Sequence, residues 1–332
     1  MTKWRSHILK MQSDTSPQAS LPEEEDLIPL VLLVGPTAVG KTEIALLLAE
    51  QMGAEVVSAD SRLFYRGMDI GTAKPTLAER SRVPHHLIDI ADPDKILSLS
   101  VFQQAAHRVI SDIHSRGKLP LLVGGTGQYV RAVTQGWTPP EVKPDLKLRD
   151  ELEKMKEERG KEWLFEKLKV LDPDAAVNID ARNSRRTIRA LEVIFTTGRK
   201  FSELRGHRES PYRLVTIGLS RPRTELYDRI DARIDAMFNQ GLLEEVRGLL
   251  SRGYSPELPT MSAIGYRECI KVINGGWNIE EARVAMRRAT RIFVRRQANW
   301  FKETDPNIKW FYAGEQGVTL AIGSFIREVI NK

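Results

Sequence analysis

The feature that most constrains this chain is the stretch Gly35-Pro-Thr-Ala-Val-Gly-Lys-Thr42, which directly follows the apolar run 30–34. It fits the phosphate-binding P-loop pattern G-x-x-x-x-G-K-[ST], in the position between a buried strand and a helix that this pattern requires. The glycines let the backbone turn its N–H groups inward around phosphate oxygens, and a following helix adds its partial positive charge. The segment therefore predicts a phosphate site followed by a helix over 43–51.

Within this loop, Lys41 is expected to meet the outer phosphate and Thr42 to hold Mg²⁺. The alternative is a tight turn between a strand and a helix that matches the pattern by chance. The pattern alone does not say whose phosphates are bound. The residues expected to bind phosphate and substrate are Gly35, Pro36, Thr37, Ala38, Val39, Gly40, Lys41 and Thr42.

The first third of the chain alternates short apolar runs with helical patterns. Strands over 30–34, 54–58 and 119–123 alternate with helices over 43–51 and 101–115. Strands that alternate with helices indicate a parallel sheet with helices on both faces. The predicted fold class is α/β, a P-loop NTPase-like parallel sheet core with a helical insertion domain.

The character of the sequence changes after Trp137-Thr-Pro-Pro140, where it becomes highly charged. A length of 332 residues exceeds one ordinary core, so we expect two structural units or one core with a large insertion. Candidate insertion helices cover 148–159, 161–170 and 186–196, and the apolar run 213–219 predicts a strand that returns to the sheet. The expected units are a disordered tail at 1–26, the first part of the core at 27–137 and a tRNA-contacting helical insertion at 138–211. The last unit, 212–332, completes the core and holds the basic C-terminal helices, expected over 224–240 and 279–301.

Cysteine content and the N-terminal residues bear on the compartment. The single cysteine, Cys269, excludes an internal disulfide and a cysteine-based zinc site. Residues 1–26 hold no apolar run long enough for a signal peptide or a membrane span. We therefore expect a cytoplasmic protein that contacts no membrane and acts as a monomer.

The positive charge of the chain is concentrated near its C-terminus. The net charge is +6, yet the segment from Arg283 to Lys302 alone holds seven basic residues and no acidic one. Basic residues recur every four positions and form one row on the expected helix, where each like-charge pair opposes helix formation by about 0.2–0.5 kcal/mol. No acid on that helix from Arg283 onward relieves the row, so we predict a nucleic-acid backbone as its partner, with a solvated charged face as the alternative. The row is Arg283, Arg287, Arg291 and Arg295, and the expected packing face is Ala285, Ala289, Ile292 and Phe293.

Arg233 lies beside the apolar stripe of the helix over 224–240, three positions after Ile230. A guanidinium at the edge of a buried face needs an anionic partner, because a desolvated unpaired charge is unfavourable. One interpretation is a salt bridge to an acid of the core, and the other is a clamp on a diphosphate.

The loop after the second strand contains the string D-S-x-x-x-Y-x-x-M-D-I-G-T-A-K-P from Asp60 to Pro75. Together with the P-loop it resembles the tRNA dimethylallyltransferases, bacterial enzymes that prenylate the N6 amine of an adenosine beside the anticodon, at position 37. The matching segments span residues 30 to 301, nearly all of the chain outside its tails. Further matches are Pro84–Asp89, Leu121–Tyr129, Arg186–Val193, Ala263–Glu268 and Arg295–Phe301.

The resemblance implies dimethylallyl diphosphate and tRNA as substrates and Mg²⁺ as cofactor. It implies Asp60 as the general base for the adenine amine, a role in which a carboxylate supplies about 10²–10⁴ in rate. It assigns the leaving diphosphate to the P-loop, Lys41 and Arg233, with Thr37 and Thr126 bonded to the substrates. The implied catalytic residues are Asp60, Thr126 and Arg233.

A base inside a stacked anticodon loop must be extruded before it reaches such a pocket. Either Lys147 or Arg149 corresponds to the tRNA-contacting arginine of the family, and surface helix charge is the alternative interpretation of Arg186 and Arg189. The candidates for holding the RNA are Asp60, Ser61, Arg62, Leu63, Thr126, Arg149, Arg182, Arg185, Arg186, Arg189, Arg287 and Arg291.

Three rival functions remain open at this stage. A P-loop kinase for small molecules or nucleotides would use the same loop for ATP, but we find no lid with paired arginines for phosphoryl transfer. A prenyltransferase acting on free adenine nucleotides would not need the basic helix or the insertion. An RNA-binding module with a relic P-loop would not need intact Lys41, Thr42 and Asp60.

Overall fold

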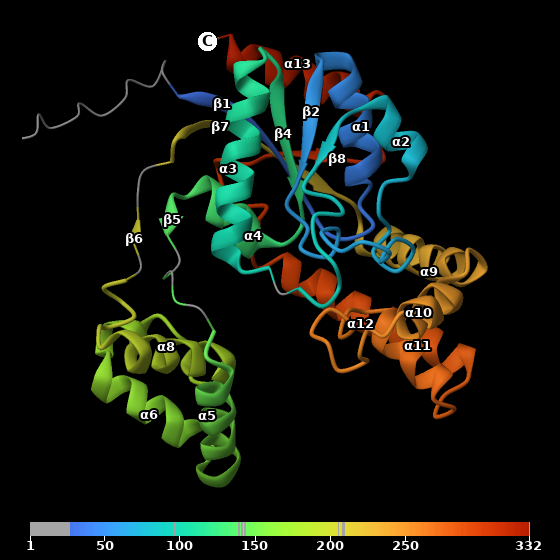
Figure 1. The fold of residues 1–332 in the computed structure, drawn as a ribbon. Coiled ribbons are helices and arrows are strands. Elements are labelled where there is room, and N and C mark those ends of the chain that lie inside the picture. The colour runs from blue at the N-terminus through green and yellow to red at the C-terminus, as the bar shows by residue number, and fades with distance from the viewer. Residues whose placement is uncertain are drawn as a thin grey trace, which may run out of the picture.

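The computed structural model describes residues 27–95, 97–138, 140, 142, 144–204, 206–207 and 210–331, so the expected tail at 1–26 lies outside the described residues. Its centre is a six-stranded sheet in the order β3-β2-β4-β1-β7-β8, seen in the upper half of Figure 1. All neighbouring strands pair in parallel, which confirms the predicted α/β class. The strands are β1 (Ile28–Val34), β2 (Ala54–Ser58), β3 (His85–His86), β4 (Leu119–Gly124), β7 (Tyr212–Ser220) and β8 (Lys309–Tyr312).

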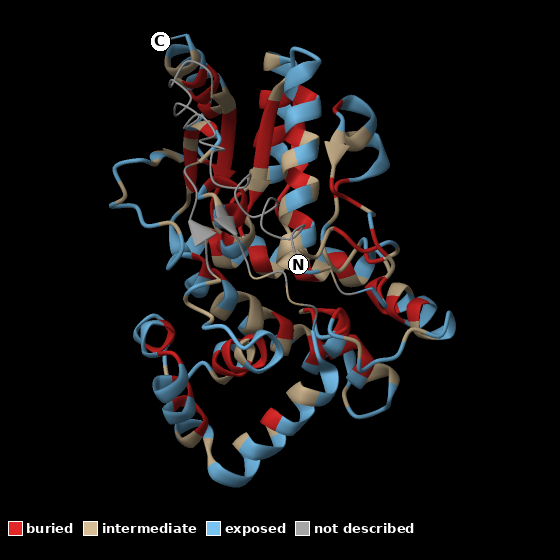
Figure 2. Cartoon of the chain, turned by 60° about the vertical axis from the view of Figure 1, so that its left-hand side comes forward, coloured by how far each residue is buried: buried red, intermediate tan, exposed pale blue. Residues whose placement is uncertain are grey.

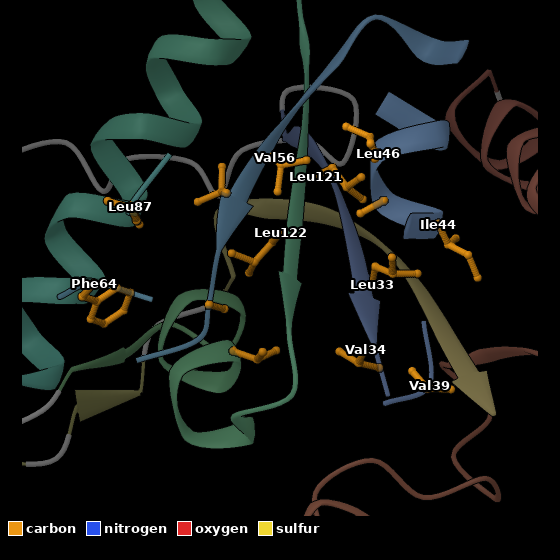
Figure 3. Close-up of a cluster of buried hydrophobic side chains, with 14 of the residues drawn as sticks. Leu33, Val34, Val39, Ile44, Leu46, Val56, Phe64, Leu87, Leu121 and Leu122 are labelled. Atoms are coloured by element: carbon orange, nitrogen blue, oxygen red, sulfur yellow. The ribbon is translucent and has the colours of Figure 1, made fainter. Parts of the chain in front are cut away.

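Helices cover both faces of this sheet. On one face α1 (Lys41–Met52) packs against α13 (Val318–Ile330), and on the other α3 (Leu99–Ser115) packs with α4 (Gly127–Thr134). Figure 3 shows Leu121 and Leu122 of β4 pointing to opposite sides, one toward α1 and the other toward α3. Because both faces are covered, the central strands are continuous apolar runs without alternation.

The buried residues of this core are drawn in red in Figure 2 along the sheet and on the inward sides of its helices. Residues 30–34 of β1 are at most 4% exposed. Within the described residues, no helix is long and apolar enough to cross a membrane.

A separate bundle lies at the lower left of Figure 1. It has its own buried cluster, in which Leu164, Leu168 and Leu191 are at most 1% exposed. The chain enters and leaves it through β5 (Trp137–Thr138) and β6 (Gly206–His207), which pair antiparallel. Its helices are α5 (Leu146–Arg159), α6 (Lys161–Leu171), α7 (Pro173–Val177) and α8 (Ser184–Thr197).

The remaining helices lie below the sheet in Figure 1, apart from α2, which lies beside it. The last of them, α12, packs against α9 and α11 and ends at Gln297, four residues before the predicted end at Phe301. These helices are α2 (Leu77–Arg82), α9 (Arg223–Asn239), α10 (Leu242–Ser251), α11 (Tyr266–Ile273) and α12 (Ile279–Gln297).

The predicted packing face of α12 is wrong. Its buried residues are Ala282, Met286, Val294 and Gln297, whereas Phe293 is 39% exposed. The arginine row pairs with aspartates of α9, so the side of α12 next to that row is the buried one.

Three of the four arginines in the row have acidic partners inside the fold, so the premise that nothing in the protein relieves the row is wrong for Arg283, Arg287 and Arg291. Arg283 and Arg287 reach Asp235 of α9 at 3.2 and 2.8 Å, and Arg291 reaches Asp231 at 2.6 Å. Two aspartates one turn apart on α9 therefore pair with three arginines of α12, and Glu280 of α12 itself lies 3.8 Å from Arg287. These ion pairs are internal to the fold and fix the contact between the two helices.

Glu55 of β2 is a buried carboxylate at the edge of the core, 5% exposed. Its oxygens accept hydrogen bonds from both terminal nitrogens of Arg116, at 2.5 and 2.8 Å, and lie 2.7 Å from His86 Nε2. The Arg116 hydrogen bonds, assisted by His86 and opposed by burial, lower the pKa of Glu55 to about 2.

We expect Glu55→Gln to lower the free energy of unfolding by about 2 kcal/mol at neutral pH, because the charged partner of Arg116 is lost. A depressed carboxyl pKa stabilises the fold above the unfolded value of 4.5, and this contribution is lost as pH falls toward about 2. Urea denaturation of both proteins at pH 7 and pH 3 should show a smaller difference at pH 3. An equal difference at both values would contradict the ionic origin of the effect.

Candidate active site

The P-loop between β1 and α1 needs glycine at both ends. Gly35 has a φ of 154°, and a Cβ there would lie 2.7 Å from the carbonyl oxygen of Leu219. Gly40, with a φ of 110°, precedes the first residue of α1. Residues with a side chain rarely adopt either of these backbone conformations.

Two arginines fix the carbonyl groups of this loop. Arg229 Nε donates to Ala38 O at 2.8 Å, and Arg221 Nε donates to Val39 O at 3.0 Å. Neither residue was among the sequence-based candidates. The available signal was the position of Arg229, one helical turn before Arg233 on α9.

Lys41 lies folded back on its own loop. Its Nζ donates to Gly35 O at 3.0 Å and to Pro36 O at 2.9 Å. Burial lowers the pKa of Lys41 to about 8, a shift that the Asp60 carboxylate opposes and the Arg233 charge increases. The amine is thus held in place by neutral acceptors that a phosphate oxygen could replace.

A cleft of about 470 Å³ opens at the carboxyl ends of β1, β2 and β4. Ligand sites in open α/β sheets lie at this edge. Its lining includes apolar side chains, among them Leu63, Val123 and Ala232. The predicted site residues that the structure brings together here are Thr37, Ala38, Gly40, Lys41, Thr42, Asp60, Leu63 and Arg233.

Arg233 has no carboxylate within ion-pair distance in the part of the chain that the structure describes. This removes the predicted alternative of a salt bridge to a core acid for those residues. Burial lowers the pKa of Arg233 and the Asp60 carboxylate opposes that shift, so the two charges act on each other across the cleft. A guanidinium stays protonated in proteins, so the cleft keeps this positive charge.

Asp60 lies two residues after the end of β2. Its amide donates to Ser58 Oγ at 3.3 Å, and its Oδ1 accepts the backbone N–H of Arg62 at 3.0 Å. This turn holds the carboxylate at the mouth of the sheet. Oδ2 has no partner among the described residues, so it is available to a substrate.

The segment after Asp60 is fixed by the buried side chain of Lys74 and by a carboxylate of α10. Lys74, whose side chain is 3% exposed, donates to Asp69 at 2.5 Å and to Asp89 at 2.6 Å. Glu245 of α10 accepts the N–H groups of Asp69, Ile70 and Gly71 at 2.7 to 3.2 Å. Asp69 and Lys74 of the D-I-G-T-A-K string therefore hold the loop, while Thr72 and Ala73 of the same string line the cleft.

Other predicted residues lie outside this cleft. Thr126 is the N-cap residue of α4, but its side chain makes no capping hydrogen bond. It follows β4, whose Val123 and Gly124 line the cleft. Gly35 and Pro36 line a second cavity of about 520 Å³ instead. Arg62 Nη1 donates to Thr260 O at 3.4 Å.

The arginines of the insertion have different surroundings. Arg149 and Arg189 bind the fully buried Glu192, at 2.9 and 2.6 Å, so their charges serve the core of the bundle. The alternative interpretation of Arg189 as surface helix charge is therefore wrong. Arg182 pairs with Asp180 at 2.7 Å, whereas Arg185 and Arg186 are exposed and have no ion pair among the described residues.

Gln297 is a site residue that sequence reasoning missed. Its side chain accepts the N–H of Thr37 at 2.8 Å and donates to Gly125 O at 3.1 Å. The available signal was a single uncharged polar residue that ends an otherwise basic run.

The chain is similar to a known family over most of its length. The family model described as IPP transferase matches residues 63–304. The tRNA dimethylallyltransferase of Roseiflexus castenholzii is 54% identical over 282 residues, 85% of this chain and 92% of the relative. That of Thermomicrobium roseum is 47% identical over 289 residues, 87% of this chain and 88% of the relative.

Two solved structures are also similar. The full-length tRNA isopentenylpyrophosphate transferase from Bacillus halodurans superposes with a TM-score of 0.68 and 42% identity, covering 91% of this chain and 97% of that one. A eukaryotic dimethylallyltransferase acting on tRNA gives a TM-score of 0.77 and 27% identity, covering 92% and 80%.

We expect the affinity of the free protein for inorganic diphosphate to fall as pH rises through about 8, the pKa of Lys41. The anion binds the protonated amine, so affinity is full below this value and declines above it by up to about tenfold per pH unit. Isothermal titration calorimetry between pH 7 and 9.5 measures the effect. Lys41→Met is the control, since it shares every other ionisation, and an identical pH dependence in both proteins would refute the assignment.

Proposed function

This chain belongs to the IPP transferase family, and we propose that it transfers a dimethylallyl group from dimethylallyl diphosphate to tRNA. The acceptor is the exocyclic N6 amine of the adenosine next to the anticodon, at position 37. The products are N6-isopentenyladenosine and diphosphate. The names of the relatives and the chemistry of the cleft support this function together.

One observation carries the chemical part of the proposal. The same cleft holds the Asp60 carboxylate and two cations, Lys41 and Arg233, together with apolar side chains. A carboxylate suits a nucleophile that must lose a proton, and the cations suit a diphosphate that leaves with negative charge. The apolar lining suits an allyl chain, which offers only dispersion and burial.

The adenine amine is a weak nucleophile because its lone pair is delocalised into the ring. As N6 attacks the allylic carbon, the N–C bond forms and the C–O bond to the diphosphate breaks. The N6 proton passes to Asp60, and the bonding electron pair leaves with the diphosphate. The P-loop amides, Lys41 and Arg233 then bind the charge that develops on the leaving oxygens.

Lys41 has to release the carbonyl groups of Gly35 and Pro36 to reach the diphosphate. The anion raises the pKa of the amine again, so a bound substrate keeps Lys41 charged. Arg233 lies on α9, a different element from the P-loop, so the two cations approach the diphosphate from different elements.

Mg²⁺ is proposed as the cofactor, held by the hydroxyl of Thr42, which is exposed and lines the cleft. The described residues contain no group of three His, Cys, Asp or Glu side chains that could hold a metal by themselves. This fits Mg²⁺, which prefers substrate phosphates and water with one or two protein ligands. When bound, it would neutralise part of the charge of the leaving diphosphate.

The tRNA is proposed to bind along exposed arginines that have no ion pair among the described residues. On α12 these are Arg288, Arg295 and Arg296, and the last two precede Gln297, which touches the P-loop. On α8 they are Arg185 and Arg186. Contact through Arg287 or Arg291 would compete with Asp235 and Asp231. We also propose that the enzyme acts as a monomer in the cytoplasm, the compartment expected from its single cysteine, Cys269.

The test of the function is Asp60→Asn, which keeps the size of the side chain but cannot accept the proton. With tRNA and labelled dimethylallyl diphosphate, the single-turnover rate should fall by at least about tenfold while tRNA affinity stays near that of the parent protein. A smaller loss would refute Asp60 as the base. ATP-dependent phosphorylation of a small molecule by the parent protein, with no label on tRNA, would favour the kinase instead.

Two matched double variants test which arginines bind RNA. Arg295→Gln with Arg296→Gln should reduce the slope of log affinity against log salt by about 1.4–1.8 units, since each lost phosphate contact removes about 0.7–0.9. Arg287→Gln with Arg291→Gln removes the same charge but breaks the pairs with α9, so it should lower the melting temperature and leave the slope nearly unchanged. Filter binding at several salt concentrations measures both slopes, and the reverse ranking would contradict the proposed RNA surface.

A further inference from the structure

Gln297 is a polar side chain buried at the end of a basic helix, only 6% exposed. Its partners are far away in sequence, 260 residues for Thr37 and 172 for Gly125. Thr37 donates an N–H and Gly125 offers a carbonyl, so both the oxygen and the nitrogen of the amide have a defined place. Among side chains of this length, only glutamine offers one acceptor and one donor at neutral pH, because an ionised glutamate can only accept.

The two partners belong to the two loops that border the reaction. Thr37 lies in the P-loop, whose backbone amides are the expected phosphate donors. Gly125 lies in the turn between β4 and α4, next to Thr126. One amide group therefore joins the phosphate cradle to the turn that carries Thr126, beyond the point where β1 and β4 cease to pair.

The packing around this amide leaves little room for another arrangement. A Cβ at Gly125 would lie 2.4 Å from Gln297 Nε2, 3.1 Å from Gly35 O and 3.4 Å from Lys41 Nζ. A Cβ at Gly127 would lie 2.3 Å from the ring of Trp300. Glycine at both positions therefore leaves room for Gln297 at the end of α12 and for Trp300, which follows that helix.

We propose that Gln297 is a positioning residue for prenyl transfer, which holds the P-loop and the Gly125–Thr126 turn in register so that the diphosphate and the adenine amine meet correctly. This rests on the proposed function. Gln297 acts through the two loops and touches no substrate. It also follows directly after Arg295 and Arg296, so the RNA-facing end of α12 is tied to the phosphate cradle through a single side chain.

The test compares Gln297→Met, which keeps the length of the side chain but removes both hydrogen bonds, with Asn299→Leu, which removes an exposed amide two residues further on. For Gln297→Met we expect kcat to fall by about tenfold or more and the affinity for inorganic diphosphate to fall several-fold, because small displacements of bound groups are costly to rate. The affinity for tRNA should stay within about twofold. Asn299→Leu should leave kcat, KM and diphosphate affinity unchanged.

Gln297→Glu supplies a second readout that a role in folding alone would not give. Its protonated carboxyl can accept from Thr37 and donate to Gly125, whereas the ionised form sets an oxygen against the Gly125 carbonyl. Its activity relative to the parent protein should therefore rise as pH falls through the titration of the carboxyl. This variant also decides the question if Gln297→Met does not fold.

The failure of this proposal and that of the proposed function are distinguishable. If the parent protein transfers no allyl group to tRNA, the function is wrong, while the diphosphate titration still measures the effect of Gln297 on the P-loop. If the parent protein is active and folded Gln297→Met keeps its kcat, KM and diphosphate affinity, the positioning role is wrong. A flat activity ratio for Gln297→Glu across pH would also overturn it.

Discussion

The parallel pairing of β1 with β4, and of β4 with β2, is the constraint on which the rest of the molecule depends. It brings the carboxyl ends of three strands to one edge, so the P-loop, Asp60 and Gly124 meet although they are far apart in sequence. Gly35 permits this convergence, since a side chain there would collide with the carbonyl of Leu219 on the neighbouring strand. Arg233 then completes the cleft from α9, the helix that follows β7.

The cleft gathers charges that the described protein atoms do not neutralise. Lys41 rests on two neutral carbonyl groups and Arg233 has no ion pair there, while Asp60 faces both. Elsewhere the chain pairs its charges closely, as at Glu55, Glu192 and Lys74. This contrast separates the charges that we propose to bind and react from those that hold the fold, and the same contrast distinguishes Arg295 and Arg296 from Arg287 and Arg291.

Sequence patterns predicted those features whose cause is local. The P-loop, the bounds of β2 and the position of Arg233 beside an apolar stripe all follow from spacing within one element. The partners of the α12 arginines did not follow, because four-residue spacing shows neighbours on one helix and says nothing of Asp231 and Asp235 on another. Gln297 was missed for a similar reason, since an uncharged residue at the end of a basic run shows neither that it is buried nor which groups it bonds.

The helical bundle of α5 to α8 has its own buried cluster, and β5 pairs with β6 where the chain enters and leaves it, so the two ends of that segment lie side by side (Figure 1). Insertions or deletions between these ends, or replacement of the whole bundle, need not change the register of the six-stranded sheet. Such changes would leave the residues that line the cleft in place. Among relatives, we expect the lengths and surfaces of this bundle to diverge faster than the cleft.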